Sequence, residues 1–294
     1  MEKMSSYSFV AAIIAVSMAF VLYLALTLSG LRALRMRTAG TVGGTRTLGL
    51  VIGPRTATLG RYGSILGWLG FAFLTAWLAF RTIATGHGPF ANMYEFSVAF
   101  AWGILGAYYW FERCYNQRIL GLLVLPLALG MLIHAATIPA TIEPLVPALQ
   151  NNLLLTVHVA VAIVAYGSFS IAFGAALLFL IQPTGGRWGL PKPNVLDEIA
   201  YKAVVIGFPF LAATLVLGAI WADVAWGSYW SWDPKETASL VTWLIYAAYL
   251  HARAVRGWAG RRAATLLLIG FAATLFTYFG NYFFGGLHSY AGLG

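Results

Sequence analysis

Hydrophobic positions along the chain form long runs, separated by short segments that hold most of the polar residues. A helix needs about 20 residues to cross a hydrocarbon core roughly 30 Å thick. Eight runs approach or exceed this length, at about 8–31, 62–82, 93–111, 119–138, 153–181, 202–222, 234–253 and 263–284. Because lipid tolerates no unpaired backbone groups and the runs lack barrel-strand alternation, each predicts a helix. The pattern predicts an all-α integral membrane protein with about eight transmembrane helices, in one polytopic domain over residues 1–294.

The basic residues lie mostly on one side of the predicted membrane. With eight spans, all but three of the 18 Lys and Arg residues fall in one set of loops; the exceptions are Lys3, Arg81 and Lys235. Since cytoplasmic loops carry the excess of Lys and Arg, both termini are predicted on the outer, periplasmic side. The segment of about 32–61 is then a basic inner loop, with a composition that favours contact with anionic headgroups.

Composition supports lipid as the main solvent of this chain. Hydrophobic residues make up 60% and charged residues 9%, against about 25% charged in average proteins. The net charge of +9 is spread over the loops of one side, so no nucleic acid partner is expected. Cys114 is the only cysteine, which excludes an intramolecular disulfide and a CxxC redox pair.

Aromatic residues are concentrated in one predicted outer loop, at about 221–236. Its four tryptophans and one tyrosine are Trp221, Trp226, Tyr229, Trp230 and Trp232. Tryptophan is also common in interfacial belts, but this density, with Gly and Ser between the rings, favours a flat apolar platform for a planar macrocycle. The following Asp233-Pro234-Lys235-Glu236 is typical of a capping box, so a helix-starting role is favoured for the two acids.

The five histidines are distributed unevenly across the predicted membrane. His158 and His288 lie at the outer level of the aromatic loop, as do His87 and His134, whereas His251 lies near the inner edge. A single histidine in a membrane helix more often bonds to a neighbouring helix than to a metal. Two neutral imidazoles facing each other across an apolar platform are typical of axial ligands to haem iron.

The segment Trp226-Gly-Ser-Tyr-Trp-Ser-Trp-Asp-Pro-Lys-Glu-Thr resembles the tryptophan-rich WWD motif of the cytochrome c assembly family. It is most similar to the CcsA-type subunit of the two-component System II synthase. Gly86-His87-Gly-Pro-Phe-Ala-Asn-Met-Tyr-Glu95 and the segments around His158, His251 and His288 are similar to further elements of the family.

This resemblance implies roles for individual residues. His158 and His288 would be the axial ligands of an outer haem b, and His251 one ligand of an inner haem. A separate CcsB-type membrane subunit would supply the second inner histidine, because this chain has no other. The aromatic residues at the outer haem would be Trp221, Trp226, Tyr229, Trp230 and Trp232. Asp233 is the candidate catalytic acid, and no role is assigned to His87 or His134.

The activity implied is cytochrome c biogenesis. Haem would be presented at the outer face for thioether attachment to the CxxCH segment of apocytochrome c, with synthase (haem lyase) activity only beside the partner subunit. The chain would also take part in haem translocation. A thioredoxin-like protein is expected to reduce the substrate thiols. The implied location is the bacterial cytoplasmic membrane with the site facing the periplasm, or a thylakoid membrane in a plastid.

Three other functions remain open at this point. A haem chaperone or exporter would deliver haem without attaching it. An electron-transfer cytochrome that uses quinol would need paired histidines at both membrane levels, and only one lies at the inner level. A secondary transporter is typically marked by Gly- and Pro-broken helices and midplane charges, which are scarce here.

Overall fold

The computed structural model describes residues 1–38, 54–142, 149, 152–182 and 190–288. Within these ranges the chain forms helices and no strands. The α-helices are α1 (Glu2–Thr38), α2 (Pro54–Thr85), α3 (Met93–Tyr115), α4 (Gly121–Ala136), α5 (Asn152–Ile181), α6 (Pro193–Trp226), α7 (Pro234–Arg256) and α8 (Arg261–Phe279), with short 3-10 helices η1 (Arg118–Leu120) and η3 (Gly280–Tyr282). The all-helical prediction is confirmed. The middle of the basic 32–61 segment lies outside the described residues.

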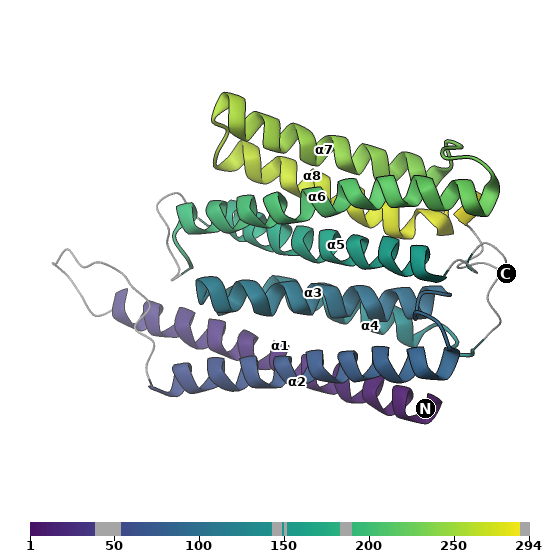
Figure 1. Ribbon diagram of the computed structural model, residues 1–294. Coiled ribbons are helices and arrows are strands. Elements are labelled where there is room, and N and C mark those ends of the chain that lie inside the picture. Colours follow the sequence, from purple (N-terminus) through teal and green to yellow (C-terminus); the bar gives the residue numbers. More distant parts are fainter. Residues whose placement is uncertain (39–53, 143–148, 150–151, 183–189, 289–294) are drawn as a thin grey trace.

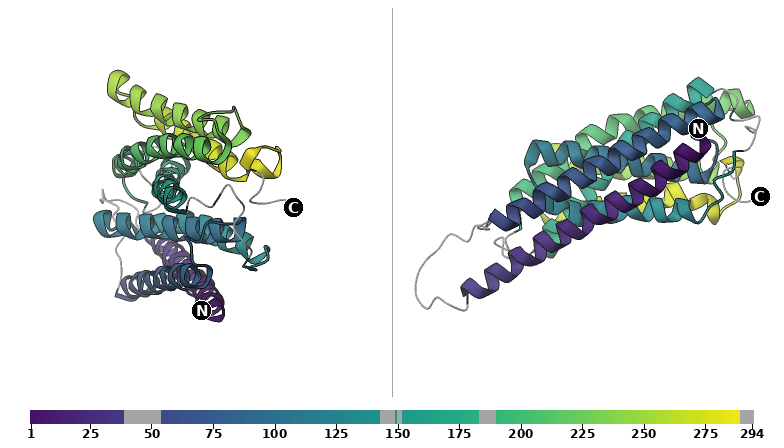
Figure 2. Two further views of the ribbon diagram at one scale, coloured as in Figure 1. Left: turned by 45° about the vertical axis from the view of Figure 1, so that its right-hand side comes forward. Right: turned by 90° about the horizontal axis from the view of Figure 1, so that it is seen from below.

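Consecutive helices run in opposite directions and form four stacked pairs, α1/α2, α3/α4, α5/α6 and α7/α8 (Figures 1 and 2). Contacts between neighbouring pairs are made by α1 with α4, by α3 with both α2 and α5, and by α5 with α8. One end of the bundle, called here the tryptophan end, holds the start of α1, the end of α6 and the start of α7 (Figure 1). The opposite end holds the start of α2 and the end of α7.

Six helices in the described part of the chain are long and apolar enough to cross a membrane: α1, α2, α4 with η1, α5, α6 and α8. The protein is therefore a multi-pass membrane protein. The two remaining helices, α3 and α7, are not apolar enough along their length to be counted with these six. In α3 the charged residues are Glu95, Glu112 and Arg113; in α7 they are Lys235, Glu236, Arg253 and Arg256.

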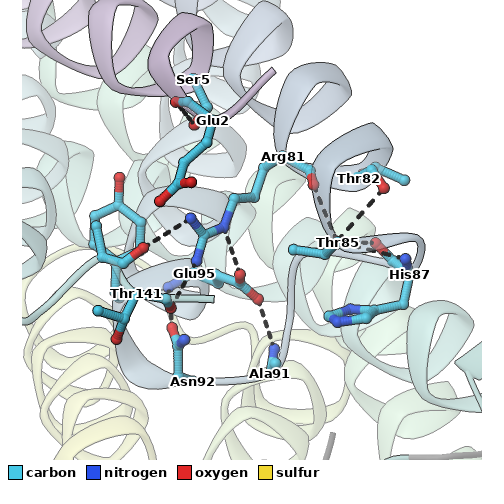
Figure 3. A network of polar contacts seen from close by, with 12 residues as sticks. Glu2, Ser5, Arg81, Thr82, Thr85, His87, Ala91, Asn92, Glu95 and Thr141 are labelled. Carbon is cyan, nitrogen blue, oxygen red and sulfur yellow. Dashed lines mark hydrogen bonds and ion pairs between the residues drawn. The ribbon is translucent and has the colours of Figure 1, made fainter. Parts of the chain in front are cut away.

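At the tryptophan end, the charge of Glu95 is neutralised inside the protein. Arg81 Nε lies 2.7 Å from Glu95 Oε1, and both side chains are buried. The other two nitrogens of Arg81 donate to the carbonyls of Ala140 (2.8 Å) and Thr141 (3.1 Å) (Figure 3). Glu95 also accepts a hydrogen bond from the Ala91 amide, at 2.8 Å. This network joins the ends of α2 and α3 to the segment after α4.

At the opposite end, Glu112 is held in a second buried cluster. Its carboxylate accepts hydrogen bonds from Tyr23 Oη (2.6 Å) and from the Ser64 hydroxyl. Arg118 Nε lies 3.6 Å from Glu112. These contacts join α1, α2 and α3, and they supply the hydrogen bonds that a buried carboxylate requires.

The aromatic segment expected as one loop is divided between a helix and a loop. α6 continues through Trp226 and ends at Gly227, whose φ of 75° is the left-handed conformation that commonly terminates helices. Trp221 therefore lies on a helix, and only residues 227–233 form a loop. The predicted capping box at the start of α7 is confirmed, because Asp233 accepts from the Lys235 amide and Glu236 from the Asp233 amide.

Candidate functional site

A cavity at the tryptophan end lies between α3, α5, α6, α7 and α8, and it encloses about 110 Å³. Most of its wall is apolar, with contributions from the first turns of α3 and from α5. The residues that bring chemistry to it are His158, Tyr229, Trp230, Lys235, Glu236 and His288. The chain thus brings the two histidines predicted as a pair to one cavity, from segments 130 positions apart in the numbering.

His158 is held against α6 by one ring nitrogen. Its Nδ1 lies 3.1 Å from the carbonyl oxygen of Thr214, so the proton of the neutral ring belongs on Nδ1. Nε2 is then the nitrogen with which His158 could bind a metal. The close approach depends on Gly218, where an added Cβ would lie 2.9 Å from the imidazole Cε1.

His288 is held in the same way by a carboxylate. Its Nδ1 donates to Asp233 Oδ1 at 2.9 Å, and the buried carboxylate also accepts from the amides of Lys235 (2.9 Å) and Leu287 (2.7 Å). Burial acts to raise the pKa of Asp233, but the hydrogen bonds from His288 and from the two amides hold it at about 2. A carboxylate on Nδ1 leaves Nε2 as the metal-binding nitrogen, the arrangement common behind histidine ligands.

The segment after η3 approaches Asp233 closely because residue 286 is a glycine. A Cβ on Gly286 would collide with Asp233 Oδ2 and lie 3.0 Å from Pro234 Cδ. Burial lowers the pKa of His288, and the nearby Lys235 ammonium acts in the same direction, while the hydrogen bond to Asp233 opposes both. The net lowering favours the neutral imidazole that a metal requires.

Trp221 contacts both histidines. Its ring stacks with His158 (centroids 6.3 Å apart, 13° between planes) and lies 5.7 Å from His288. Trp221 is 2% exposed, and Trp226 packs edge-on against it at 4.7 Å and against His288 at 4.9 Å. The end of α6 thus fixes the position of the two imidazoles relative to each other.

The aromatic residues of the loop lie differently. Tyr229 and Trp230 line the cavity, although Tyr229 is also largely exposed. Trp232 is 69% exposed and packs edge-on against Trp230 at 5.7 Å. Its φ of 59° is a left-handed conformation that bulky side chains rarely adopt. Trp232 is therefore placed toward the surroundings rather than into the cavity.

The other three histidines lie away from this cavity. His134 bonds to Ser97 Oγ (3.0 Å) and to the Tyr282 hydroxyl (3.2 Å), which links α4 to α3 and η3. His87 Nδ1 contacts the carbonyl of Gly88 at 2.8 Å. His251 is exposed near the end of α7, at the opposite end of the bundle.

Lys235 is a cavity residue that the sequence analysis did not select. It lines the wall with its ammonium 5.8 Å from the ring centroid of Phe96. In the sequence it stands out only as a cation in the first turn of a helix, where the helix dipole disfavours positive charge.

A family model described as Cytochrome C assembly protein matches residues 90–288, which include every residue of the cavity wall. The chain belongs to the cytochrome c assembly family. The site is thus built entirely within the part of the chain that the family shares.

Relatives named "Cytochrome c biogenesis protein CcsA" match most of the chain. The one from Gloeobacter violaceus is 36% identical, over 75% of this chain and 83% of the relative. The one from Synechocystis is 36% identical (74% and 84%), and the one from Chlamydomonas reinhardtii is 40% identical (72% and 64%). The predicted assignment to the CcsA-type members of the family is confirmed. The protein is therefore a cytochrome c biogenesis protein.

A solved structure named "Cytochrome c Heme Lyase CcmF" has the same fold. The TM-score is 0.67 at 20% sequence identity, covering 95% of this chain and 46% of that one. The chain thus spans about half of that larger protein. At this identity, the likeness concerns the arrangement of the helices.

Proposed function

We propose that the protein binds haem b at the tryptophan end and presents it for covalent attachment to the CxxCH segment of apocytochrome c. The observation that carries this proposal is the pair of imidazoles in one cavity. His158 and His288 each have Nδ1 held by a fixed oxygen, and both contact Trp221. Two neutral imidazoles with Nε2 as donor are suited to both axial positions of haem iron.

The cavity has room for only part of a porphyrin. Its volume of about 110 Å³ is below the roughly 300–1,000 Å³ of pockets that bury a drug-sized ligand. A porphyrin held there would leave one edge outside, beside the exposed rings of Tyr229 and Trp232. The cost of the left-handed backbone at Trp232, about 1–3 kcal/mol, favours a binding role for that exposed ring over a folding role.

The chemistry supported is thioether formation. Each cysteine thiol adds across one haem vinyl group, with sulfur bonding to one carbon and the proton ending on the other, so no electrons are gained or lost. The contribution of this chain is orientation. Asp233 orients His288 in this proposal, because a carboxylate with a pKa of about 2 that accepts three hydrogen bonds is a poor proton donor.

In the proposed topology, all eight helices cross the membrane and both termini lie outside. The buried partners of Glu95 and Glu112 support a transmembrane α3. The charges of α7 support the same for that helix, since they are confined to its first and last turns. Two of the three predicted outer cations, Arg81 and Lys235, lie against the protein interior, which leaves few solvated cations at the tryptophan end. That end would face the periplasm of a bacterium, with a thylakoid membrane as the plastid equivalent.

The proposed partners complete what this chain lacks. His251 is exposed, so a CcsB-type subunit could place a second histidine beside it and pass haem on toward the tryptophan end. Cys114 is the single cysteine and lies near the end of α3 at the opposite end of the bundle. A thioredoxin-like protein would therefore reduce the thiols of apocytochrome c.

Co-expression with the partner subunit and one CxxCH apocytochrome tests the proposal, with covalently bound haem as the readout. His158→Ala and His288→Ala should each abolish attachment, whereas His87→Ala, outside the cavity, should not. Attachment that survives in both cavity variants would exclude the ligand assignment. Haem that is bound by the wild-type chain but never attached would favour the chaperone or exporter function instead.

A further inference from the structure

The cavity wall contains one cation without a fixed anion. Among the ion pairs of the described residues, none includes Lys235. The contact resolved for its ammonium is the face of Phe96, 5.8 Å from the ring centroid. Its side chain is half-buried in a wall that otherwise consists mostly of apolar and aromatic groups. Such a position costs solvation free energy, and among the described residues no ion pair offsets it.

Helix stability does not account for this lysine. Lys235 is the second residue of α7, after Pro234, where the partial positive charge of the helix dipole opposes an ammonium group. Asp233 and Glu236 already perform the capping of that turn through their own hydrogen bonds. The positive charge of Lys235 is thus unfavourable for the start of α7 itself.

The two nearby carboxylates already accept hydrogen bonds from other donors. Asp233 accepts from His288 Nδ1 and from two backbone amides. Glu236 Oε2 accepts from the amides of Ser231 (2.9 Å) and Asp233 (3.2 Å) and from the Ser231 hydroxyl. Both acids are held in place for the loop and for His288. An anion that pairs with Lys235 would therefore come with the ligand.

The geometry points to Lys235 as the residue that binds a carboxylate side chain of the macrocycle in this cavity. This inference rests on the proposed function, and it specifies which part of the cargo the site recognises. In haem b the two propionates are on adjacent pyrroles, opposite the two vinyl-bearing pyrroles. An ammonium that holds a propionate therefore fixes the position of the vinyl edge, while the imidazoles fix only the iron.

Binding measurements with two porphyrins test this role on the purified full-length chain. The probes are haem b and its dimethyl ester, in which both propionates are uncharged. The wild type should bind haem roughly 10- to 100-fold more tightly than the ester, as expected for a charge-assisted contact. Lys235→Gln should reduce haem binding to the level of the ester and leave ester binding unchanged. Lys235→Arg should keep the preference.

Lys202→Gln is the matched control, because Lys202 pairs with Glu198 on an exposed face of α6. It should keep the preference of the wild type. Equal affinity of the wild type for the two porphyrins, or equal loss of both in Lys235→Gln, would overturn the role of Lys235. Binding of neither porphyrin by the wild type would overturn the proposed function as well. Ester binding by Lys235→Gln itself reports that the variant is folded.

Discussion

The two ends of the bundle carry buried polar clusters of different kinds. At the opposite end, Glu112 is surrounded by hydroxyl groups and Arg118, all within α1, α2, α3 and η1, and His251 stands apart on α7. At the tryptophan end, the carboxylate of Asp233 bonds to a histidine that lines a cavity. The Glu112 cluster joins helices to one another, whereas the Asp233 cluster positions a residue of the cavity.

The difference shows how much of each site a single chain supplies. At the tryptophan end, α5, α6, the start of α7 and the segment after α8 bring two imidazoles, their orienting oxygens and aromatic walls together. At the opposite end, the described residues supply one exposed histidine. We therefore expect the outer haem site to persist in the chain by itself, and the inner one to require a partner.

Among substitutions that keep both histidines, the largest effect on haem affinity is expected from removing the charge behind His288. Asp233→Asn keeps a good N-cap for α7 but weakens the acceptor of the His288 Nδ1 proton. Haem affinity at the tryptophan end should fall about 10- to 100-fold, as is typical for lost partners of ligand histidines. Haem titration followed by absorbance measures it.

Asp197→Asn gives the matching change at the opposite end, where Asp197 lies 2.7 Å from Arg253. Its haem affinity should equal that of the wild type. Equal loss in the two variants would show that the effect of Asp233 is general destabilisation.

A smaller loss of haem affinity is expected when a neighbouring substitution shifts the His158 ring. Gly218→Ala would put a Cβ 2.9 Å from its Cε1, so the ring must move by a few tenths of an ångström. Haem affinity should fall by roughly threefold to tenfold, which corresponds to about 0.7–1.4 kcal/mol. The titration used for Asp233 measures this.

Gly130→Ala is the control, because no atom lies within 4 Å of its added Cβ in the middle of α4. It should leave haem affinity unchanged and stabilise the helix by roughly 0.5–1 kcal/mol. Identical haem affinities in the two alanine variants would contradict the packing of His158 against α6.

The smallest effect is expected on the exposed part of the aromatic segment. Trp232→Gly should raise thermal stability slightly, by up to about 1 kcal/mol, since glycine adopts φ near 59° without strain. Trp221→Ala, at a buried ring, should cost about 3–5 kcal/mol. Thermal unfolding in detergent compares them. A large loss of stability in Trp232→Gly would mean that this ring serves folding.

The sequence predicted the helices well because long apolar runs leave lipid-exposed backbone no alternative to a helix. The capping box at Asp233 and the common level of His158 and His288 also follow from local patterns. The end of α6 was harder to place. The only local sign of the helix end is Gly227, six residues beyond Trp221. Nothing in the local sequence shows that Trp221 packs against two histidines.

Other features of the site depend on contacts between distant segments. The bond from His288 to Asp233 requires the chain after α8 to return to the start of α7, with Gly286 providing the space. The exposure of Lys235 to the cavity depends on Phe96 of α3. Hydrophobic periodicity carries no information about such contacts.

Haem binding by the purified full-length chain, without any partner, tests whether His158 and His288 are the ligands of the haem iron. We expect one bound haem with the low-spin spectrum of two imidazole ligands. This spectrum should persist in His251→Ala and be lost in His158→Ala and in His288→Ala. A low-spin spectrum that survives in both of the latter variants and disappears in His251→Ala would contradict the assignment of the site to the tryptophan end.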